Sequence, residues 1–324
     1  MGGRNSKYRY GTHETAEHKR DDRVTRMEKE KGCSKPHKNQ IQIRDFSVGH
    51  FPEGYQEQDL FELVKLIAGL TVLIEVQFCS EKRLDYWQKT RIKYPGSEWK
   101  GKKTNLTGSG RIADIFQDKN GPKFCTCSKC KEDSVQRELW TIVVITATHV
   151  VFDNSEANSS SCYLFYDTDD GNYIQINCTK CRWSHDSGDL CFLEGFTCDR
   201  ELFNNINNKI KQFNVLWKTI HDRYALDERK EKIERKYYYK RLVVVVSHPH
   251  GGPKKISLGR LDEQLKNKLK NDTGYQLYYD SPTCEGSSGA PVYLYGQDWF
   301  KVEYVHSGTT EDRQLNHSTT WCPK

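Results

Sequence analysis

The sequence lacks the two features that direct a chain into or across a membrane. Its first residues are strongly polar, so they do not form the apolar core of a secretory signal peptide. No run approaches the roughly 18 consecutive apolar residues of a membrane-spanning helix. We therefore expect a cytoplasmic protein, whose twelve cysteines are thiols or metal ligands rather than disulfides.

Other shortages narrow the class of function. Hydrophobic residues make up only 35% of the 324 residues and charged residues 29%, so part of the chain is expected to be solvated tail or linker. The net charge of +6 is too small to indicate nucleic-acid binding by itself, and we find no motif that reads RNA or DNA. No solenoid-type repeat is present. The length still allows one large domain or two small ones with a sizeable core.

The amino-terminal stretch carries one short pattern of its own. The first six residues, M-G-G-R-N-S, match the M-G-x-x-x-[ST] pattern for myristoylation of Gly2, and basic residues follow. One acyl chain binds membranes only marginally, so the basic residues would supply a second signal. A chance match in a polar start is the alternative. Peripheral membrane contact through this end is therefore one of two open interpretations.

Apolar patterning divides the chain into five parts. Apolar residues at helical spacing predict one helix at 57–70 and another from about 202 to 220. Between and after them lie short β-branched runs, at spacings near ten residues in the last part, which are typical of a sandwich or barrel. The predicted parts are a disordered basic tail (1–40), a helical segment (41–70), a β unit with a cysteine-rich insertion (71–200), a helical connector (201–241) and a second β unit (242–324).

A serine-containing turn is the first candidate for chemistry. Residues 283–292 read T-C-E-G-S-S-G-A-P-V, and glycines beside a serine let consecutive backbone N–H groups point into one small space. Alone, a flexible Ser/Gly turn is the commoner explanation. A serine nucleophile also needs a histidine base and a carboxylate that orients it. Candidates are His149, at the end of a β-branched run, and Asp189, which opens D-L-C-F-L.

The three motifs together carry a resemblance. T-A-x-H, D-L-x-x-L and G-x-S-G-[AG]-P, in that order over roughly residues 71–310, resemble the chymotrypsin-like (trypsin-like) serine peptidases. The resemblance implies a mainly β fold of two packed six-stranded antiparallel β-barrels, with a triad in the cleft between them. It implies Ser288 as nucleophile, His149 as general base and acid, Asp189 as orienting carboxylate, and an oxyanion hole made by the N–H groups of Gly286 and Ser288.

Four details refine the resemblance. Ser287 stands where the secreted family has an aspartate that pairs with a new N-terminus after zymogen cleavage, so that switch is absent. The pattern is closer to the intracellular and HtrA-like branch, as is S-H-P-H-G-G at 247–252. The stretch T-G-S-G at 107–110 is similar to the small-residue turn before the family's histidine. Asp186 competes with Asp189 as the third member.

Substrate preference has a weaker signal. V-H-S-G at 305–308 aligns with the strand that lines the primary specificity pocket, which would then comprise Pro282, His306, Ser307 and Gly308. A histidine at position 306 resembles glutamyl endopeptidases and viral cysteine peptidases, which use it to bind Glu or Gln; alternatively His306 points into the barrel. Pro282 offers no carboxylate for a basic side chain, which argues against cleavage after Lys or Arg.

The cysteines suggest a structural metal. C-x-C-x-x-C (Cys125, Cys127, Cys130) and C-x-x-C (Cys178, Cys181) offer thiolates for one tetrahedral Zn²⁺ that would staple a loop. Unligated thiols are the alternative, and Cys162, Cys191 and Cys198, in apolar contexts, are expected to be core residues. Catalysis itself needs no cofactor.

The sequence leaves three functions to compare. The first is an intracellular serine endopeptidase that hydrolyses polypeptides through an acyl-enzyme. The second is a catalytically inactive peptidase-fold module that binds peptides. A zinc-stabilised nucleic-acid binder is the third, but the basic residues are interleaved with acidic ones and nucleic acid is not an expected partner.

Overall fold

The fold was taken from a computed structural model of the chain. The structure describes residues 13–17, 31–33, 35, 37, 39–87, 91–117, 124–125, 128–185, 188–234, 242–262, 267–268, 275–295, 303–310 and 315–321.

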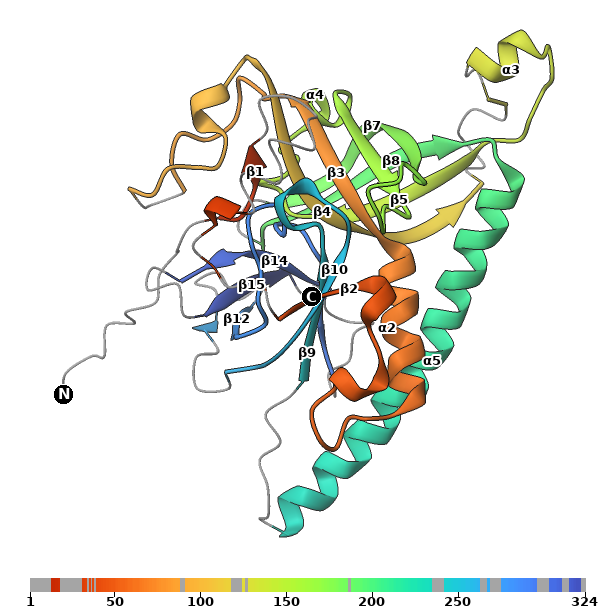
Figure 1. Ribbon diagram of the computed structural model, residues 1–324. Coiled ribbons are helices and arrows are strands. Elements are labelled where there is room, and N and C mark those ends of the chain that lie inside the picture. Colours follow the sequence, from red (N-terminus) through yellow and green to blue (C-terminus); the bar gives the residue numbers. More distant parts are fainter. Residues whose placement is uncertain are drawn as a thin grey trace.

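The first β unit is a closed six-stranded antiparallel barrel, and the protein is mainly β as predicted (Figure 1). Its strands pair in the order β4-β3-β6-β7-β8-β5, and β5 returns to β4. Their bounds are β3 Thr71–Phe78, β4 Lys103–Phe116, β5 Trp140–Thr146, β6 Ser160–Leu164, β7 Ile174–His185 and β8 Leu190–Thr197. β5 is buried along its whole length, which its β-branched sequence explains.

The small-residue stretch at 107–110 is not a turn. It lies inside β4, a continuous strand of 14 residues. Its glycines serve close packing: a Cβ on Gly108 would lie 2.7 Å from Val150 Cγ1 and 3.0 Å from the Ser288 carbonyl oxygen. Because Gly108 has no side chain, this strand can lie directly against the serine-containing turn at 283–291.

The second β unit is built from two four-stranded sheets. One has the order β13-β9-β10-β2 and the other β11-β12-β15-β14. Single bridges join them, between Leu261 and Tyr279 and between Pro291 and Val305. The bounds are β2 Gln40–Gln42, β9 Leu242–Ser247, β10 Lys255–Arg260, β11 Asn267–Lys268, β12 Tyr275–Tyr279, β13 Val292–Leu294, β14 Glu303–Thr309 and β15 Asn316–Trp321.

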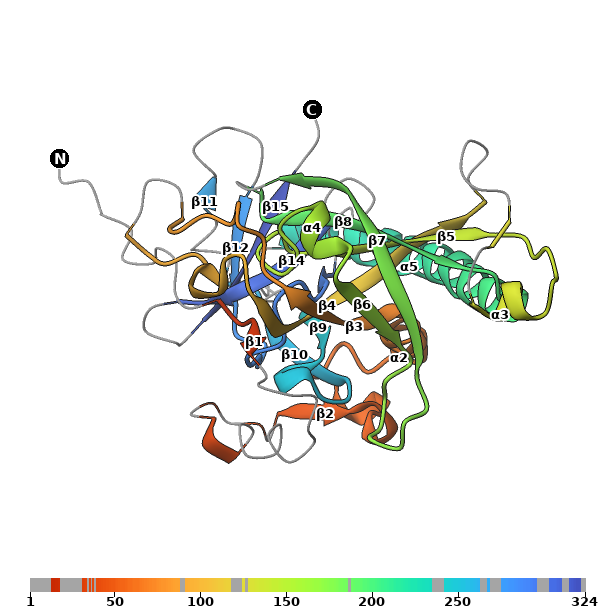
Figure 2. The same cartoon turned by 90° about the horizontal axis from the view of Figure 1, so that it is seen from above.

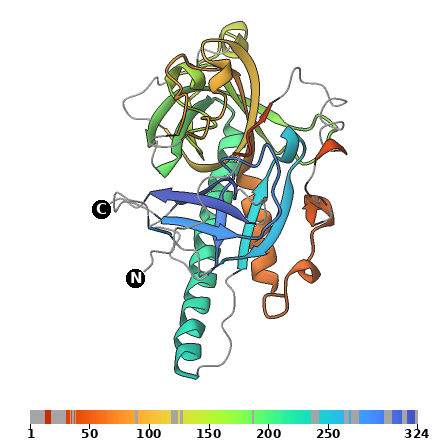
Figure 3. The same cartoon turned by 90° about the vertical axis from the view of Figure 1, so that its left-hand side faces the viewer.

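Two helices brace the β units, as the periodicity predicts. Helix α2 (Gln58–Leu70) buries its apolar stripe and packs against α5 (Arg200–Glu234), which runs along both units (Figure 3). On α5, Phe203 stacks on Trp140 of the first barrel, whereas Trp217 packs against Tyr293 of β13. Within the described residues, no helix is long and apolar enough to cross a lipid bilayer.

Short helices fill the loops. They are α3 Ser128–Glu132, α4 Asn154–Ala157, and the 3-10 turns Ile43–Asp45, Val48–His50, Ser97–Trp99 and Pro249–Gly251. The projecting α3 belongs to the predicted cysteine-rich insertion (Figure 1).

The amino-terminal part departs from a disordered tail where it is described. Residues 16–17 form β1, which pairs antiparallel with β4, and β2 pairs antiparallel with β10 (Figure 2). Composition predicts disorder because few apolar residues are present; backbone pairing with existing strand edges orders these residues instead. The Gly2 pattern lies outside the described residues.

Candidate active site

The serine-containing turn at 283–291, which we call the nucleophile turn after the role predicted for Ser288, follows β12 and precedes β13. Two of its glycines have positive φ, 92° at Gly286 and 81° at Gly289. A Cβ on Gly286 would lie 2.5 Å from the His248 carbonyl oxygen, and one on Gly289 would collide with the Thr146 hydroxyl. Only glycine satisfies both the torsion and the space at these positions. The turn thereby presents Ser288, which is fully buried.

The three residues predicted as a triad lie in one hydrogen-bonded row. His149 Nε2 is 2.7 Å from Ser288 Oγ, and His149 Nδ1 is 2.7 Å from Asp189 Oδ2. Asp189 also accepts from the backbone N–H of His149 at 3.1 Å and from the Ser307 hydroxyl at 2.7 Å. The competing Asp186 lies outside the described residues.

The charge state of Asp189 follows from its neighbours. Burial raises the pKa of this carboxyl, but the charge of His149 and hydrogen bonds from His149 and Ser307 outweigh burial and lower the pKa below its usual range. An ionised carboxylate accepts a hydrogen bond from Nδ1–H. The other ring nitrogen, Nε2, is then left as an acceptor for the Ser288 hydroxyl.

A buried ion pair is hydrogen-bonded to the backbone at His149. Arg83 and Glu156 have fully buried side chains, and Arg83 Nε lies 2.6 Å from Glu156 Oε1. The same guanidinium donates to the carbonyl oxygens of His149 at 2.9 Å and Val150 at 3.2 Å. The loop that follows β5 is thus tied to a charged pair whose separation would leave a buried charge without its partner.

The chain's own residues 13–17 lie against Ser288. The carbonyl oxygen of Glu14 accepts hydrogen bonds from the backbone N–H groups of Gly286 at 2.6 Å and Ser288 at 3.1 Å. These are the two N–H groups that the sequence predicts as an oxyanion hole. The Glu14 N–H also donates to Ser288 Oγ at 3.0 Å.

The Glu14 side chain points to His306. His306 Nε2 lies 2.7 Å from Glu14 Oε2, and His306 Nδ1 lies 2.6 Å from the hydroxyl of Tyr279. Burial raises the pKa of Tyr279, so its hydroxyl stays protonated and donates to Nδ1. Burial, together with the charges of Lys35 and His149, lowers the pKa of His306 against the opposing effect of Glu14. The neutral ring therefore carries its proton on Nε2, aimed at the carboxylate.

Lys35 completes the surroundings of the carboxylate. Its ammonium pairs with Glu14 Oε1. Burial raises the pKa of Glu14, but the charge of Lys35 and the hydrogen bond from His306 outweigh burial and lower the pKa to about 2. A buried glutamate is therefore held ionised by one cation and one neutral donor.

Two of the other predicted pocket residues, Ser307 and Gly308, contact His13. The carbonyl oxygen of Ser307 accepts from His13 Nδ1 at 3.0 Å, and Gly308 forms a β-bridge with His13. Pro282 is half-buried just after β12. Sequence reasoning missed His13, Glu14, Lys35 and Tyr279. The His306 motif was the one signal for a glutamate partner, but it does not say which of the chain's acidic residues binds there.

The cysteines predicted to share one zinc ion separate into different groups. Cys125 and Cys130 lie with Cys198, their sulfur atoms all within 4.8 Å of one another. Cys178 lies 3.4 Å from Cys162, and Cys181 lies 3.4 Å from Cys191, measured between sulfur atoms. Cys127 lies outside the described residues.

Comparisons with known proteins give similarity in structure but not in sequence. No family model matches the chain, and no curated protein matches it. Solved structures that are similar to it include the Rv3671c protease of M. tuberculosis in its active form, with 15% identity, a TM-score of 0.39, and coverage of 80% of this chain and 78% of that one. Deg5 has 14% identity and a TM-score of 0.42 over 83% and 90%. The serine endoprotease of Yersinia pestis has 11% identity and a TM-score of 0.38 over 80% and 61%.

Proposed function

We propose that this protein is a serine endopeptidase that hydrolyses polypeptides through an acyl-enzyme. The observation that carries the proposal is the row Ser288–His149–Asp189, with both ring nitrogens of His149 at 2.7 Å from their partners. This arrangement meets the requirement that a weak serine nucleophile be hydrogen-bonded to a base whose tautomer is held by a carboxylate.

The proposed reaction uses each group once per half-cycle. Ser288 Oγ attacks the substrate carbonyl carbon while its proton moves to His149 Nε2. The oxygen that becomes negative is bound by the N–H groups of Gly286 and Ser288, and each such donor is worth about 3 kcal/mol of transition-state stabilisation. His149 then protonates the leaving amine. In the second half-cycle it activates the water that hydrolyses the ester.

We further propose that the primary pocket prefers glutamate. Three groups support this preference: the neutral His306 that donates to a carboxylate, Tyr279 that fixes its tautomer, and Lys35 that supplies the charge. A basic side chain would face the Lys35 ammonium and the Nε2–H of His306, and it would find no acceptor in that set.

The proposed setting is intracellular and reducing, and a polypeptide is the expected partner. It is supported by the thiols of the described cysteines, which include buried neighbours such as Cys162 and Cys178 without a disulfide between them. Peripheral membrane contact through Gly2 stays a proposal, tested by incorporation of a myristate analogue in the wild type but not in Gly2→Ala.

Labelling with a fluorophosphonate tests the proposed activity. The probe is expected to modify Ser288, and both His149→Ala and Ser288→Ala should abolish labelling. A peptide library should then be cleaved after Glu. A folded wild type that binds library peptides without being labelled would favour the alternative, a peptide-binding module without activity. Cleavage spread evenly over residue types would contradict the glutamate preference alone.

A further inference from the structure

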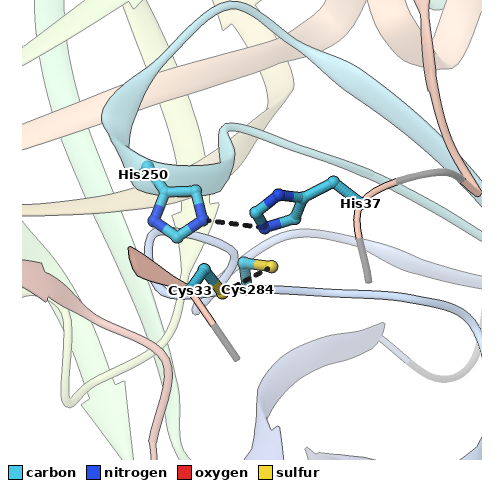
Figure 4. Close-up of side chains that lie close together, drawn as sticks. All are labelled: Cys33, His37, His250 and Cys284. Carbon is cyan, nitrogen blue, oxygen red and sulfur yellow. Dashed lines mark hydrogen bonds between the residues drawn. The ribbon is translucent and has the colours of Figure 1, made fainter. Parts of the chain in front are cut away.

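Four side chains outside the predicted triad converge on one point. Cys33, His37, His250 and Cys284 place their ligand atoms within 4.8 Å of one another (Figure 4). The two sulfur atoms are 3.7 Å apart, and the two Nε2 atoms are 3.3 Å apart. In the close-up the two Nε2 atoms point toward each other, with the ring planes at 79°, and the sulfur atoms lie together beside them.

These separations fit the edges of a tetrahedron around zinc. Bond lengths of about 2.3 Å for Zn–S and about 2.05 Å for Zn–N give edges of about 3.8 Å between sulfurs and about 3.3 Å between nitrogens. The donor set, two thiols and two imidazoles, is one that structural zinc sites use, and it leaves no position open for substrate. Gln40 Nε2 lies 3.3 Å from Cys284 Sγ, where it can donate to a thiolate.

The ligands come in two pairs from distant parts of the chain. Cys33 and His37 are half-buried in the amino-terminal stretch, whereas His250 and Cys284 are buried beside the nucleophile turn. The backbone N–H of His250 donates to the carbonyl oxygen of Glu285 at 2.5 Å. A metal here would therefore fasten residues 33–37 to the turn that carries Ser288.

We propose that Cys33, His37, His250 and Cys284 form a structural Zn²⁺ site. The site would also affect the glutamate pocket. Lys35 lies between the ligands Cys33 and His37 in the sequence, and it pairs with Glu14. Zinc holds Lys35 over the carboxylate and so completes the pocket described above. This inference does not depend on catalysis, because it concerns binding of the metal alone.

Zinc content of the full-length chain tests this site. All proteins carry Cys130→Ala, which removes a ligand atom from the other cysteine group. That background is expected to hold about one zinc ion per chain after exposure to zinc and dialysis, and X-ray absorption should show two sulfur and two nitrogen ligands. Adding His37→Ala or Cys33→Ser should bring zinc near zero, whereas His50→Ala, at an exposed histidine, should leave it unchanged. A background chain without zinc, or a folded His37→Ala chain that retains it, would overturn the proposal.

A second inference rests on a different observation, the strand pairing of residues 13–17 beside Ser288. His13 forms an antiparallel bridge with Gly308, and Ala16 and Glu17 pair antiparallel with Thr107 and Leu106 of β4. Strand pairing thus holds the chain on both sides of the Glu14–Thr15 peptide bond. Between these pairings the Glu14 carbonyl oxygen accepts from both N–H groups of the oxyanion hole. This is how a substrate presents its scissile bond.

We infer that the chain cleaves its own Glu14–Thr15 bond, which rests on the proposed endopeptidase function. Ser288 Oγ bonds to the Glu14 carbonyl carbon, and the proton of the hydroxyl passes through His149 to the nitrogen of Thr15 as the C–N bond breaks. Residues 1–14 remain as an ester on Ser288 until one water molecule hydrolyses it. The products are a free Glu14 carboxylate and a chain that begins at Thr15, separated from the Gly2 pattern.

Intact mass and amino-terminal sequencing of the full-length protein test self-cleavage. The wild type is expected to begin at Thr15, at a rate independent of protein concentration, whereas Ser288→Ala stays intact. Glu14→Gln should slow the reaction about tenfold or more, because a neutral amide loses the charge attraction of Lys35. The control Glu53→Gln, at an exposed glutamate outside the pocket, should leave the rate unchanged.

The outcomes separate self-cleavage from the proposed function. A wild type that is labelled by fluorophosphonate and cuts peptides after Glu, yet keeps the Glu14–Thr15 bond, refutes self-cleavage only. If Glu14→Lys is labelled faster than an intact wild type, residues 13–17 are an inhibitor, which also refutes it. Absence of labelling, of peptide cleavage and of self-cleavage in folded protein refutes both.

Discussion

Replacing Asp189 by asparagine tests the proposed role of the carboxylate most directly. One oxygen of Asp189, Oδ1, accepts from the backbone N–H of His149 at 3.1 Å, a donor that cannot rotate. An asparagine must therefore keep its oxygen there and place its NH₂ at the Oδ2 position, 2.7 Å from His149 Nδ1. Nδ1 also lies 2.9 Å from Oδ1, but the NH₂ group at the shorter distance donates to it, so we expect Nδ1 to become an acceptor and the ring proton to move to Nε2. His149 then no longer accepts the proton of Ser288.

The expected magnitude follows from loss of the base with the site otherwise intact. A wrong histidine tautomer lowers kcat about 10⁴-fold in a Ser-His-Asp enzyme, which is about 5.4 kcal/mol at 1.36 kcal/mol per tenfold. KM should change little, because His306 and Lys35 bind the Glu14 side chain. Initial rates on a fluorogenic peptide with Glu before the scissile bond give both parameters. Ser307→Ala, which removes one hydrogen bond to Asp189 without changing the tautomer, serves as the milder comparison. A kcat for Asp189→Asn within tenfold of the wild type would refute the assignment.

Three further predictions concern the surroundings of this row. Arg83→Met leaves the Glu156 carboxylate buried without its partner, and we expect a loss of about 3–5 kcal/mol of stability, seen as a Tm lower by roughly 10 °C; a shift below about 2 °C would contradict it. Gly286→Ala places a Cβ 2.5 Å from the His248 carbonyl oxygen at a φ of 92°, so the oxyanion N–H is displaced and kcat should fall about 100-fold in the peptide assay, with unchanged kcat as the contrary result. Burial and the charge of His149 lower the pKa of His13 from 6.5 to about 3 when residues 13–17 are docked. Docking therefore requires a neutral His13. It is fully favourable above pH 6.5 and weakens as the pH falls toward 3, by up to about tenfold per pH unit. The ratio of the self-cleavage rate of the wild type to that of His13→Phe should therefore decline below pH 6.5, because phenylalanine does not titrate. The other titratable groups near the ring are common to both proteins: His149, Asp189, His306 and His317. A ratio that stays constant with pH would contradict this prediction.

Local motifs allow the most reliable predictions for this chain. Ser288, His149 and Asp189 each sit in a short pattern whose meaning depends on neighbours in sequence, and their order points to one arrangement before any coordinates are known. The same holds for α2, whose apolar spacing predicts the stripe that is buried. The stretch at 107–110 was interpreted differently because glycine favours turns in isolation. At Gly108 of β4 the missing side chain instead lets two backbones approach, which depends on Ser288 in the other β unit.

The features that the sequence did not predict depend on contacts between residues that are distant in the chain. The grouping of cysteines depends on strand register and loop position, so spacing alone joins Cys178 to Cys125, whereas the structure places Cys178 beside Cys162 and Cys125 beside Cys198. The ligands Cys33 and His37 meet partners more than 200 residues away. Nothing local marks such pairs, because they depend on strand pairing and on loops that are distant in sequence.

The proposed metal site and the proposed self-cleavage constrain each other through Lys35. Lys35 reaches Glu14 from between two metal ligands, so removal of zinc should weaken the pocket for glutamate without touching Ser288, His149 or Asp189. A chelator should then slow self-cleavage and cleavage of Glu peptides, while fluorophosphonate labelling, which needs no glutamate in the pocket, continues. A Lys35→Met variant with zinc present should reproduce the effect of the chelator on Glu peptides, since both remove the same positive charge from the carboxylate. If the chelator abolished labelling as well, zinc would be holding the nucleophile turn itself, through Cys284 and His250, and Lys35 would be a secondary contributor.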